Sequence, residues 1–294
     1  MRGFKDFQHV TISVSDVSRS LAFYRDLLGF PALGRLYYRN KVGLVIDFLG
    51  LGNDTILEIF SFQNATTKPS EWVADDLQLG LRHIGFKVRD VDEVTARLKA
   101  AGVPFTLEPM DAAGGVRIAF FRDPDGNSLE IVQGEVRYHT GTPTIAPWPV
   151  SHCSAAPIRE LSLDHVAMTV SDLEPALRFY QDILGFPLLG QLFLGDARGF
   201  TITYLRAGSA VLELFSFSVP TIEHRWNPDE TVLGLKHLGF LVQDVAAAAD
   251  ELMAHGVRII YPPANALGNV TTCFFADPDG NALELIDGTC TYDE

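Results

Sequence analysis

The feature that most constrains this 294-residue sequence is a histidine-led segment that occurs four times. It reads HVTISVSDV from residue 9, HIGFKVRDV from 83, HVAMTVSDL from 165 and HLGFLVQDV from 237. The two halves also align from end to end at an offset of 154 to 156 residues, as in FFRDPDGNSLEIV and FFADPDGNALELI. Such internal similarity indicates a duplicated architecture. Each half divides again, so the chain contains four modules of similar design.

Every module predicts the same order of elements. In the first, apolar and polar residues alternate over residues 9–14, as in a half-buried strand. A helix follows, with Ser15 or Asp16 as its N-cap and Gly29 at its C-terminal stop. Short strands with turn residues between them occupy residues 42–62. The sequence therefore predicts an α+β fold of four βαβββ modules, paired into two domains.

The domain boundaries follow from the repeat and from a proline-rich stretch between the halves. We expect an N-terminal domain at 1–134 with modules 1–74 and 75–134, a linker at 135–160, and a C-terminal domain at 161–294 with modules 161–232 and 233–294.

Two irregular stretches, near residues 63–80 and 218–234, join the modules inside each half. They carry a conspicuous set of side chains: Glu71, Trp72, His224, Arg225 and Trp226. These stretches could cover a pocket, although ordinary connectors anchored by a tryptophan explain them equally well.

Charge and composition exclude several classes of partner. A net charge of −14 and a pI near 4.9 disfavour binding to nucleic acid or to an anionic membrane. No apolar run has the length of a membrane span, and the first residues lack the apolar core of a signal peptide. Cys153, Cys273 and Cys290 show no metal-type or redox-type spacing. We therefore expect a cytoplasmic protein with reduced thiols.

The repeated histidines and glutamates indicate metal chemistry. Each module opens with a histidine strand and closes with a leucine-glutamate strand, 47 to 49 residues later. Glu58 shares its strand face with Ile56, Phe60 and Phe62, where a carboxylate is costly unless it is paired or metal-bound. Imidazole and carboxylate together suit Fe²⁺, Ni²⁺, Co²⁺, Mn²⁺ or Zn²⁺. Two paired modules would supply two histidines and two glutamates to one divalent metal ion.

The modules resemble a known family. The βαβββ repeat, the phrase SVSDVSRSLAFYRDLLGF and the twin DPDGN-x-LE endings are similar to the vicinal oxygen chelate superfamily. That superfamily includes glyoxalase I, methylmalonyl-CoA epimerase, extradiol dioxygenases and metal-free antibiotic-binding proteins. DPDGN itself is interpreted as a tight turn in which glycine supplies a positive φ, with no catalytic role.

The order His, Glu, His, Glu in each half resembles bacterial glyoxalase I. In that family a ligand glutamate also moves a proton between the two carbons of a metal-bound enediolate, which by resemblance makes Glu130 and Glu284 the bases. Sites formed within each half are the first expectation. Sites shared across the halves, such as His9 and Glu58 with His237 and Glu284, use the same residues. The resemblance implies these eight ligands: His9, Glu58, His83, Glu130, His165, Glu213, His237 and Glu284.

The substrate is expected to differ from that of glyoxalase I. The family usually has an arginine four residues after the first ligand and an asparagine four residues after the next, and both grip glutathione. Here those positions hold Ser13 and Phe62 in one half, and Thr169 and Phe217 in the other. A more apolar small molecule with oxygens on adjacent carbons fits these residues better.

Three alternatives stay open. An extradiol dioxygenase with Fe(II) would use His165, His237 and Glu284, but Phe274 stands where that family has tyrosine. Epimerases also lack the glutathione anchors, yet they generally have glutamine where Glu58 and Glu213 stand. Lys87 could hold a substrate anion, although a solvated surface lysine is the more common case. An antibiotic-sequestering protein needs no metal ligands.

The sequence thus predicts a metal-dependent lyase or isomerase of the glyoxalase type. We expect its partner to be a small-molecule substrate, and the protein to be a monomer with two pseudo-symmetric halves or a homodimer.

Overall fold

The computed structural model describes residues 1, 3–140 and 161–293. Most of the predicted linker at 135–160, including Cys153, lies outside the described residues. The domain boundaries on either side of it stay a prediction.

The four modules each fold as βαβββ, as the repeat predicts. The first contains β1 (Phe4–Ser13), α1 (Val17–Leu21) with a π-helical continuation η1 (Ala22–Leu27), β2 (Ala32–Tyr37), β3 (Leu44–Gly52) and β4 (Thr55–Phe62). The second contains β5 (Gly80–Lys87), α2 (Val91–Ala100), β6 (Phe105–Asp111), a short 3₁₀ turn η2 (Ala113–Gly115), β7 (Arg117–Arg122) and β8 (Ser128–Gln133).

The second half repeats this order. The third module contains β9 (Ser162–Thr169), α3 (Leu173–Leu177) with η3 (Arg178–Ile183), β10 (Leu188–Phe193), β11 (Thr201–Ala207) and β12 (Ala210–Ser216). The fourth contains β13 (Gly234–Val242), α4 (Val245–Ala254), β14 (Ile259–Ala266), β15 (Val270–Ala276) and β16 (Ala282–Gly288).

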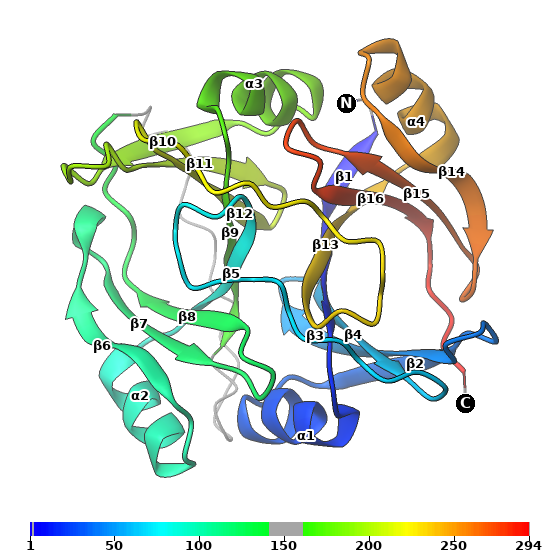
Figure 1. Cartoon of the computed structure of the whole chain (residues 1–294), viewed down its shortest axis with the longest axis horizontal. Helices are drawn as coiled ribbons and strands as arrows, with labels where there is room; N and C mark the ends of the chain where they lie inside the picture. The colour runs from blue at the N-terminus through cyan, green and yellow to red at the C-terminus, as the bar shows by residue number, and fades with distance from the viewer. Residues whose placement is uncertain (2, 141–160, 294) are drawn as a thin grey trace.

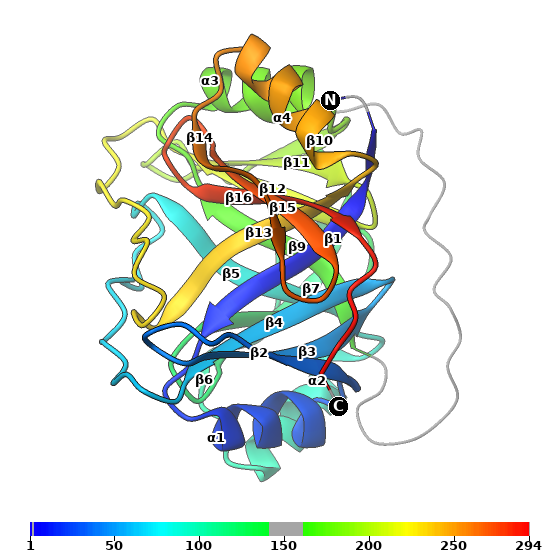
Figure 2. The same cartoon turned by 90° about the vertical axis from the view of Figure 1, so that its right-hand side faces the viewer.

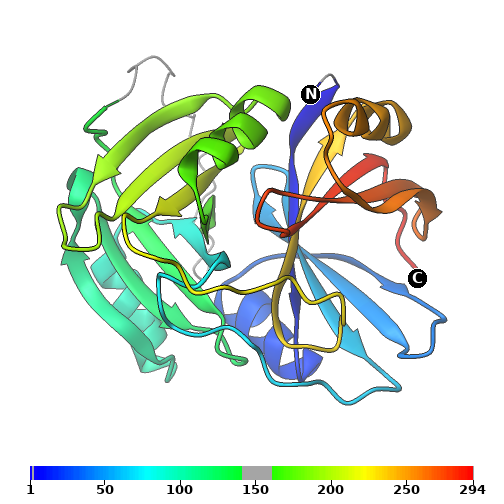
Figure 3. The same cartoon turned by 45° about the horizontal axis from the view of Figure 1, so that its top comes forward.

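The modules pair across the halves of the chain, not within them. One eight-stranded sheet has the order β14-β15-β16-β13-β1-β4-β3-β2, and the other has the order β10-β11-β12-β9-β5-β8-β7-β6. The antiparallel pairs β1–β13 and β5–β9 join the modules at the centre of each sheet. Figures 1 and 3 show the two strongly curved sheets, one built from the first and last modules and the other from the two middle modules.

Strand alternation divides β1 between two surfaces. Val10 and Ile12 are fully buried in a continuous apolar core that contains residues of both sheets. His9 and Thr11 point to the opposite face of the strand, as period-two alternation requires. Burying apolar side chains between the sheets stabilises the fold and leaves one face of each sheet available for a site.

The helices follow a different pairing from the strands. Figure 2 shows α1 and α2 at one end of the molecule and α3 and α4 at the other, so helices of the same half lie together. Asp16, one of the two residues expected to cap α1, accepts hydrogen bonds from the Ser18 and Arg19 amides. Gly29, with φ 84°, follows the last turn.

The DPDGN segments form the tight turns that the sequence predicts, and they also connect modules of the same half. Asp123 Oδ1 accepts from the backbone amides of Asp125 and Asn127, and Gly126 has φ 89°. Tyr24, from the neighbouring module, donates its hydroxyl to Asp123 Oδ2 at 2.9 Å. The second half repeats this contact, with Tyr180 donating to Asp277 Oδ2 at 2.8 Å.

These tyrosines compensate a buried carboxylate, and their loss should be measurable. Burial raises the pKa of Asp277 to about 6, so the group is charged above that pH. Tyr180→Phe removes one donor from this buried anion and should lower the free energy of unfolding by about 2 kcal/mol at pH 8. Tyr24→Phe should act similarly through Asp123. Urea denaturation measures both, with Tyr261→Phe, at an exposed position, as the control. Equal stabilities for Tyr180→Phe and Tyr261→Phe would contradict this account.

Candidate metal centres

The structure brings the eight candidate ligands into two buried clusters, one on each sheet. The first centre consists of His9, Glu58, His237 and Glu284. The second centre consists of His83, Glu130, His165 and Glu213. All eight residues are between 0% and 7% exposed.

The expectation of sites within each half is wrong, and the arrangement across the halves is the one observed. The reason is the strand pairing: β1 bonds to β13 and β5 bonds to β9. His9 therefore lies beside His237, with ring centroids 5.2 Å apart, and His83 beside His165 at 5.1 Å.

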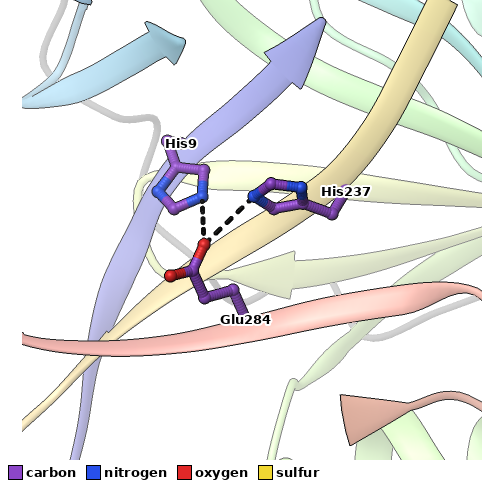
Figure 4. Close-up of side chains that lie close together, drawn as sticks. All are labelled: His9, His237 and Glu284. Atoms are coloured by element: carbon purple, nitrogen blue, oxygen red, sulfur yellow. Dashed lines mark ion pairs between the residues drawn. The ribbon is translucent and has the colours of Figure 1, made fainter. Parts of the chain in front are cut away.

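In the first centre the Glu284 carboxylate lies between two imidazoles. Its Oε2 is 3.1 Å from His9 Nε2 and 3.0 Å from His237 Nε2, as Figure 4 shows. Glu58 Oε2 is more distant, at 3.7 Å from His9 Nε2. Thr11 donates its hydroxyl to that same carboxylate oxygen at 2.9 Å. Two histidines and one glutamate thus form the tight part of the site, with a second glutamate beside them.

The second centre is more compact. Glu130 Oε2 is 2.9 Å from His83 Nε2 and 3.0 Å from His165 Nε2, and the two Nε2 atoms are themselves 3.0 Å apart. The three donor atoms form an almost equilateral triangle. Glu213 Oε2 lies 3.7 Å from His165 Nε2.

These donor sets fit a divalent cation. Nitrogen and oxygen ligands lie about 2.1 Å from such an ion, so adjacent ligands of an octahedron are about 3.0 Å apart. The triangle in the second centre has edges of that length. In the first centre, buried His9 Nε2 has no hydrogen-bond partner among the described residues. Both observations indicate nitrogen lone pairs directed at a common point.

Hydrogen bonds to Nδ1 orient one histidine of each centre. His9 Nδ1 contacts Gln8 Oε1, and His165 Nδ1 contacts Asp164 Oδ2 at 2.9 Å. A proton held on Nδ1 leaves the Nε2 lone pair free for a metal ion. The two centres differ here, because the partner is a neutral amide in the first and a carboxylate in the second.

Two glycines that the sequence reasoning did not identify make room for these histidines. A Cβ atom at Gly239 would lie 2.0 Å from His9 Cε1, and one at Gly85 would lie 2.0 Å from His165 Cε1. Both glycines occur two residues after a candidate ligand histidine, in HIGF and HLGF. Their presence in the second and fourth modules alone was the available signal that these modules accept a histidine from another strand.

The surroundings give the carboxylates of the two centres different pKa values. Although burial acts in the opposite direction, hydrogen bonds from His165 and His83 lower the pKa of Glu130 to about 2. Burial likewise opposes the shift at Glu284, but the nearby imidazoles of His237 and His9 lower its pKa to about 2. Burial raises the pKa of Glu213 to about 7, although His165 opposes the rise.

Aromatic rings surround both centres. His237 lies 5.0 Å from the Phe274 ring and 6.1 Å from the Phe60 ring. His83 has Phe120 at 5.0 Å and Phe215 at 6.0 Å. This is the apolar environment that the sequence predicts around the glutamates, and it strengthens electrostatic interactions inside each site.

Segments that follow β8 and β16 cross the edge of each sheet. Tyr292 packs against Phe48, with ring centroids 5.0 Å apart, and leaves no space for a side chain at Gly34. Tyr138 packs against Tyr204 at 5.1 Å and does the same at Gly190. Each site is therefore enclosed by residues of both modules of its sheet.

Lys87 does not extend freely toward a site. Its Nζ donates to the Gly134 carbonyl and lies 3.1 Å from Glu135 and 3.8 Å from Asp164.

Among the residues that the structure describes, no helix is long and apolar enough to cross a membrane.

Comparison with known proteins identifies relatives for both halves. A family model described as Glyoxalase/Bleomycin resistance protein/Dioxygenase superfamily matches residues 6–131 and 162–285. The Escherichia coli protein YaeR, described as uncharacterized, is 35% identical over 133 residues, which are 45% of this chain and 99% of that protein. Arabidopsis thaliana lactoylglutathione lyase GLX1 is 28% identical over 192 residues, which are 63% of this chain and little more than half, 56%, of that enzyme.

Solved structures share the fold over nearly the whole chain. Glyoxalase I from Zea mays has a TM-score of 0.71 at 23% identity, covering 96% of this chain and 92% of that one. A putative dioxygenase from Bacillus subtilis has a TM-score of 0.67 at 17% identity, covering 98% of this chain and 86% of that one. These likenesses confirm the α+β architecture of paired βαβββ modules.

The glycines opposite the histidines offer a selective test of each centre. Gly239→Ala should displace His9 and abolish metal binding at the first centre, whereas Gly85→Ala should affect only the second. Elemental analysis of protein loaded with Mn²⁺ should show about one equivalent fewer in either variant. Gly50→Ala, where a Cβ meets ordinary contacts at 3.5 Å, is the control. Full metal content in Gly239→Ala would contradict the positioning role of this glycine.

The partner of His165 Nδ1 should tune affinity at the second centre. Asp164→Asn replaces a carboxylate by an amide and should weaken metal binding there by about 10- to 100-fold. The reciprocal Gln8→Glu should strengthen the first centre. Competition titration against a chelator measures both affinities. Unchanged affinity in Asp164→Asn would show that its bond to His165 does not influence the metal site.

Proposed function

Because the chain belongs to the Glyoxalase/Bleomycin resistance protein/Dioxygenase superfamily, we propose that it is a metal-dependent lyase or isomerase of the glyoxalase type. Its substrate is a small molecule with oxygens on adjacent carbons. The observation that carries this proposal is the triangle of His83, His165 and Glu130 donors, with a fourth carboxylate beside it. Relatives named lactoylglutathione lyase and glyoxalase I support the reaction class.

The proposed ligands are the eight residues of the two centres, and the cofactor is Fe²⁺, Ni²⁺, Co²⁺, Mn²⁺ or Zn²⁺. Such an ion would polarise a carbonyl and acidify the neighbouring C–H bond. The histidines would hold the ion through Nε2, and the surrounding phenylalanines would exclude water from the reacting carbons.

Proton transfer is assigned to Glu130 in the second centre and Glu284 in the first. Each has one carboxylate oxygen between two imidazoles, which fixes its position. A carboxylate so placed takes the proton from one carbon and returns it to the next. Glu58 and Glu213, more than 3.5 Å from the nearest histidine nitrogen, are the alternative bases. The pKa of Glu213, raised to about 7 by burial, suits this role better than the pKa of about 2 of Glu130.

We propose a substrate other than a glutathione conjugate. Ser13 and Thr169 occupy the positions where glutathione-binding relatives carry arginine, and both are fully buried. Ser13 donates to the Glu230 carbonyl at 2.6 Å and Thr169 to the Asp76 carbonyl at 2.7 Å. These hydroxyls hold the connectors in place, so an α-hydroxycarbonyl compound with an apolar body fits better.

A second candidate function is ring cleavage by an Fe(II) dioxygenase. The tight part of each centre is two histidines and one glutamate, the facial set used by non-haem iron oxygenases. Glu58 and Glu213 beside those sets favour the lyase, because they occupy space next to the ion that oxygen and a catechol would need.

Substitution of the glutamates tests the reaction and the base together. Glu130→Gln combined with Glu284→Gln should reduce kcat at least about 100-fold, the usual contribution of a general base. Turnover is followed as C–H exchange of α-hydroxycarbonyl compounds in D₂O, in parallel with oxygen uptake on catechols. The double variant Glu58→Gln and Glu213→Gln is the matched comparison, because it replaces the two alternative bases instead.

Each result has a distinct meaning. Loss of exchange in the second pair alone would transfer the role of base to Glu58 and Glu213. Oxygen uptake without C–H exchange would replace the lyase by the dioxygenase.

A further inference from the structure

A cavity separate from both metal centres lies where the two connectors meet. The segments 63–79 and 218–233 run side by side, joined by hydrogen bonds such as Lys68 to the Thr231 carbonyl and Leu79 to the Ile222 carbonyl. Figure 1 shows them crossing the middle of the molecule, in cyan and yellow. Beneath them is a cavity of about 190 Å³ that we call the axial pocket. Its lining includes Trp72, Leu81, Arg82, Trp226, Leu235 and Lys236.

The internal repeat places equivalent residues on both sides of the axial pocket. Trp72 corresponds to Trp226, and Arg82 to Lys236, at the same offset that relates the two halves. Arg82 and Lys236 directly precede ligand histidines, so strand alternation turns them to the other face of the sheet. None of the eight candidate metal ligands lines the pocket.

On one side the indole of Trp226 and the ammonium of Lys236 both have protein acceptors. Trp226 donates its indole N–H to the Lys236 carbonyl at 2.9 Å. The Lys236 ammonium donates to the carbonyls of Asn227, Asp229 and Val232. These two donors therefore need no acceptor from a bound molecule.

The other side differs. Among the described residues, neither the buried Trp72 indole nitrogen nor the buried Arg82 Nε has a hydrogen-bond partner. Arg82 is 4% exposed, and its Nη1 reaches the Val73 carbonyl only at 3.4 Å. Two buried donors without acceptors are costly. An acceptor that belongs to a bound molecule would satisfy both.

The charges and surfaces around these donors describe that molecule. The guanidinium groups of Arg82 and Arg122 both stack on the Trp72 ring, at 5.0 and 4.7 Å, so the ring already has cationic neighbours. Asp76 lies 4.0 Å from Arg82 but also 3.5 Å from Arg198, and does not neutralise Arg82 alone. Because Arg82 shares this carboxylate with Arg198, an anionic acceptor at its Nε would be stabilised.

The carboxylates in the lining have donors of their own. Asp125 accepts from Ser15 and Arg19, and Glu71 accepts from Asn227 at 3.3 Å. Leucine and tryptophan side chains form much of the remaining wall. A volume equivalent to about six waters admits one small organic molecule.

We propose that the axial pocket binds a small organic carboxylate, whose oxygens accept hydrogen bonds from Trp72 Nε1 and Arg82 Nε while its apolar body lies between the connectors. This site is independent of the proposed reaction, because it shares no residue with either metal centre.

Benzoate is the probe for this site, and the indole N–H signals of ¹⁵N-labelled, Zn²⁺-loaded protein are the readout. Benzoate should shift the Trp72 signal in a saturable manner. Trp72→Phe keeps an aromatic ring, removes the donor and should weaken binding about tenfold, as followed at the Trp226 signal. Trp226→Phe is the matched control and should change the affinity by less than about twofold, because its N–H already serves a carbonyl.

Arg82→Lys keeps the charge, removes Nε and should also weaken binding. Unchanged metal content and melting temperature would show that each variant is intact. Benzamide, which has the same shape without the charge, and inorganic phosphate, which lacks an apolar body, should bind poorly.

Four results would overturn the proposal. They are no saturable shift with benzoate, equal weakening by Trp72→Phe and Trp226→Phe, equal affinity for benzamide, and binding of phosphate in preference to benzoate.

Discussion

Antiparallel bonding between β1 and β13, and between β5 and β9, determines nearly everything else in this molecule. These contacts bring histidines that are more than 200 residues apart in the first centre into one site. They also place the apolar faces of all four central strands in a common core. Both the stability of the fold and the geometry of the sites therefore depend on the same strand pairs.

Much of the fold and the candidate site could be predicted from the sequence, because the repeat is regular. Strand alternation around His9, the cap at Asp16 and the glycine stops are local signals, and the structure confirms them. Module pairing is not local. Four similar edges can pair in several ways, and the choice depends on packing between distant segments. The within-half expectation failed for this reason, and the alternative across the halves, which uses the same eight residues, is the arrangement observed.

The two centres are related by pseudo-symmetry but are not equivalent. Thr11 touches Glu58 in the first centre, whereas Ala167 occupies that position in the second. Tyr204 in the second centre corresponds to Phe48 in the first. Gln8 and Asp164 differ in charge beside their histidines. These differences change the electrostatic field at the donor atoms. The two sites should therefore differ in metal preference and reactivity. The axial pocket is also asymmetric, because Trp226 and Lys236 have protein acceptors whereas Trp72 Nε1 and Arg82 Nε have none among the described residues.

Helices of the same half lie together, whereas strands pair across the halves. This arrangement also constrains the order in which the protein can fold during synthesis. While β13 is still inside the ribosome, β1 lacks its antiparallel neighbour and presents an open edge, which invites aggregation. The second sheet can assemble earlier, because β5 and β9 are closer in the sequence. Cotranslational folding would then begin with the middle modules and end when the last module closes around the first. A protein divided at its midpoint would yield two fragments, neither of which contains a complete His/Glu cluster.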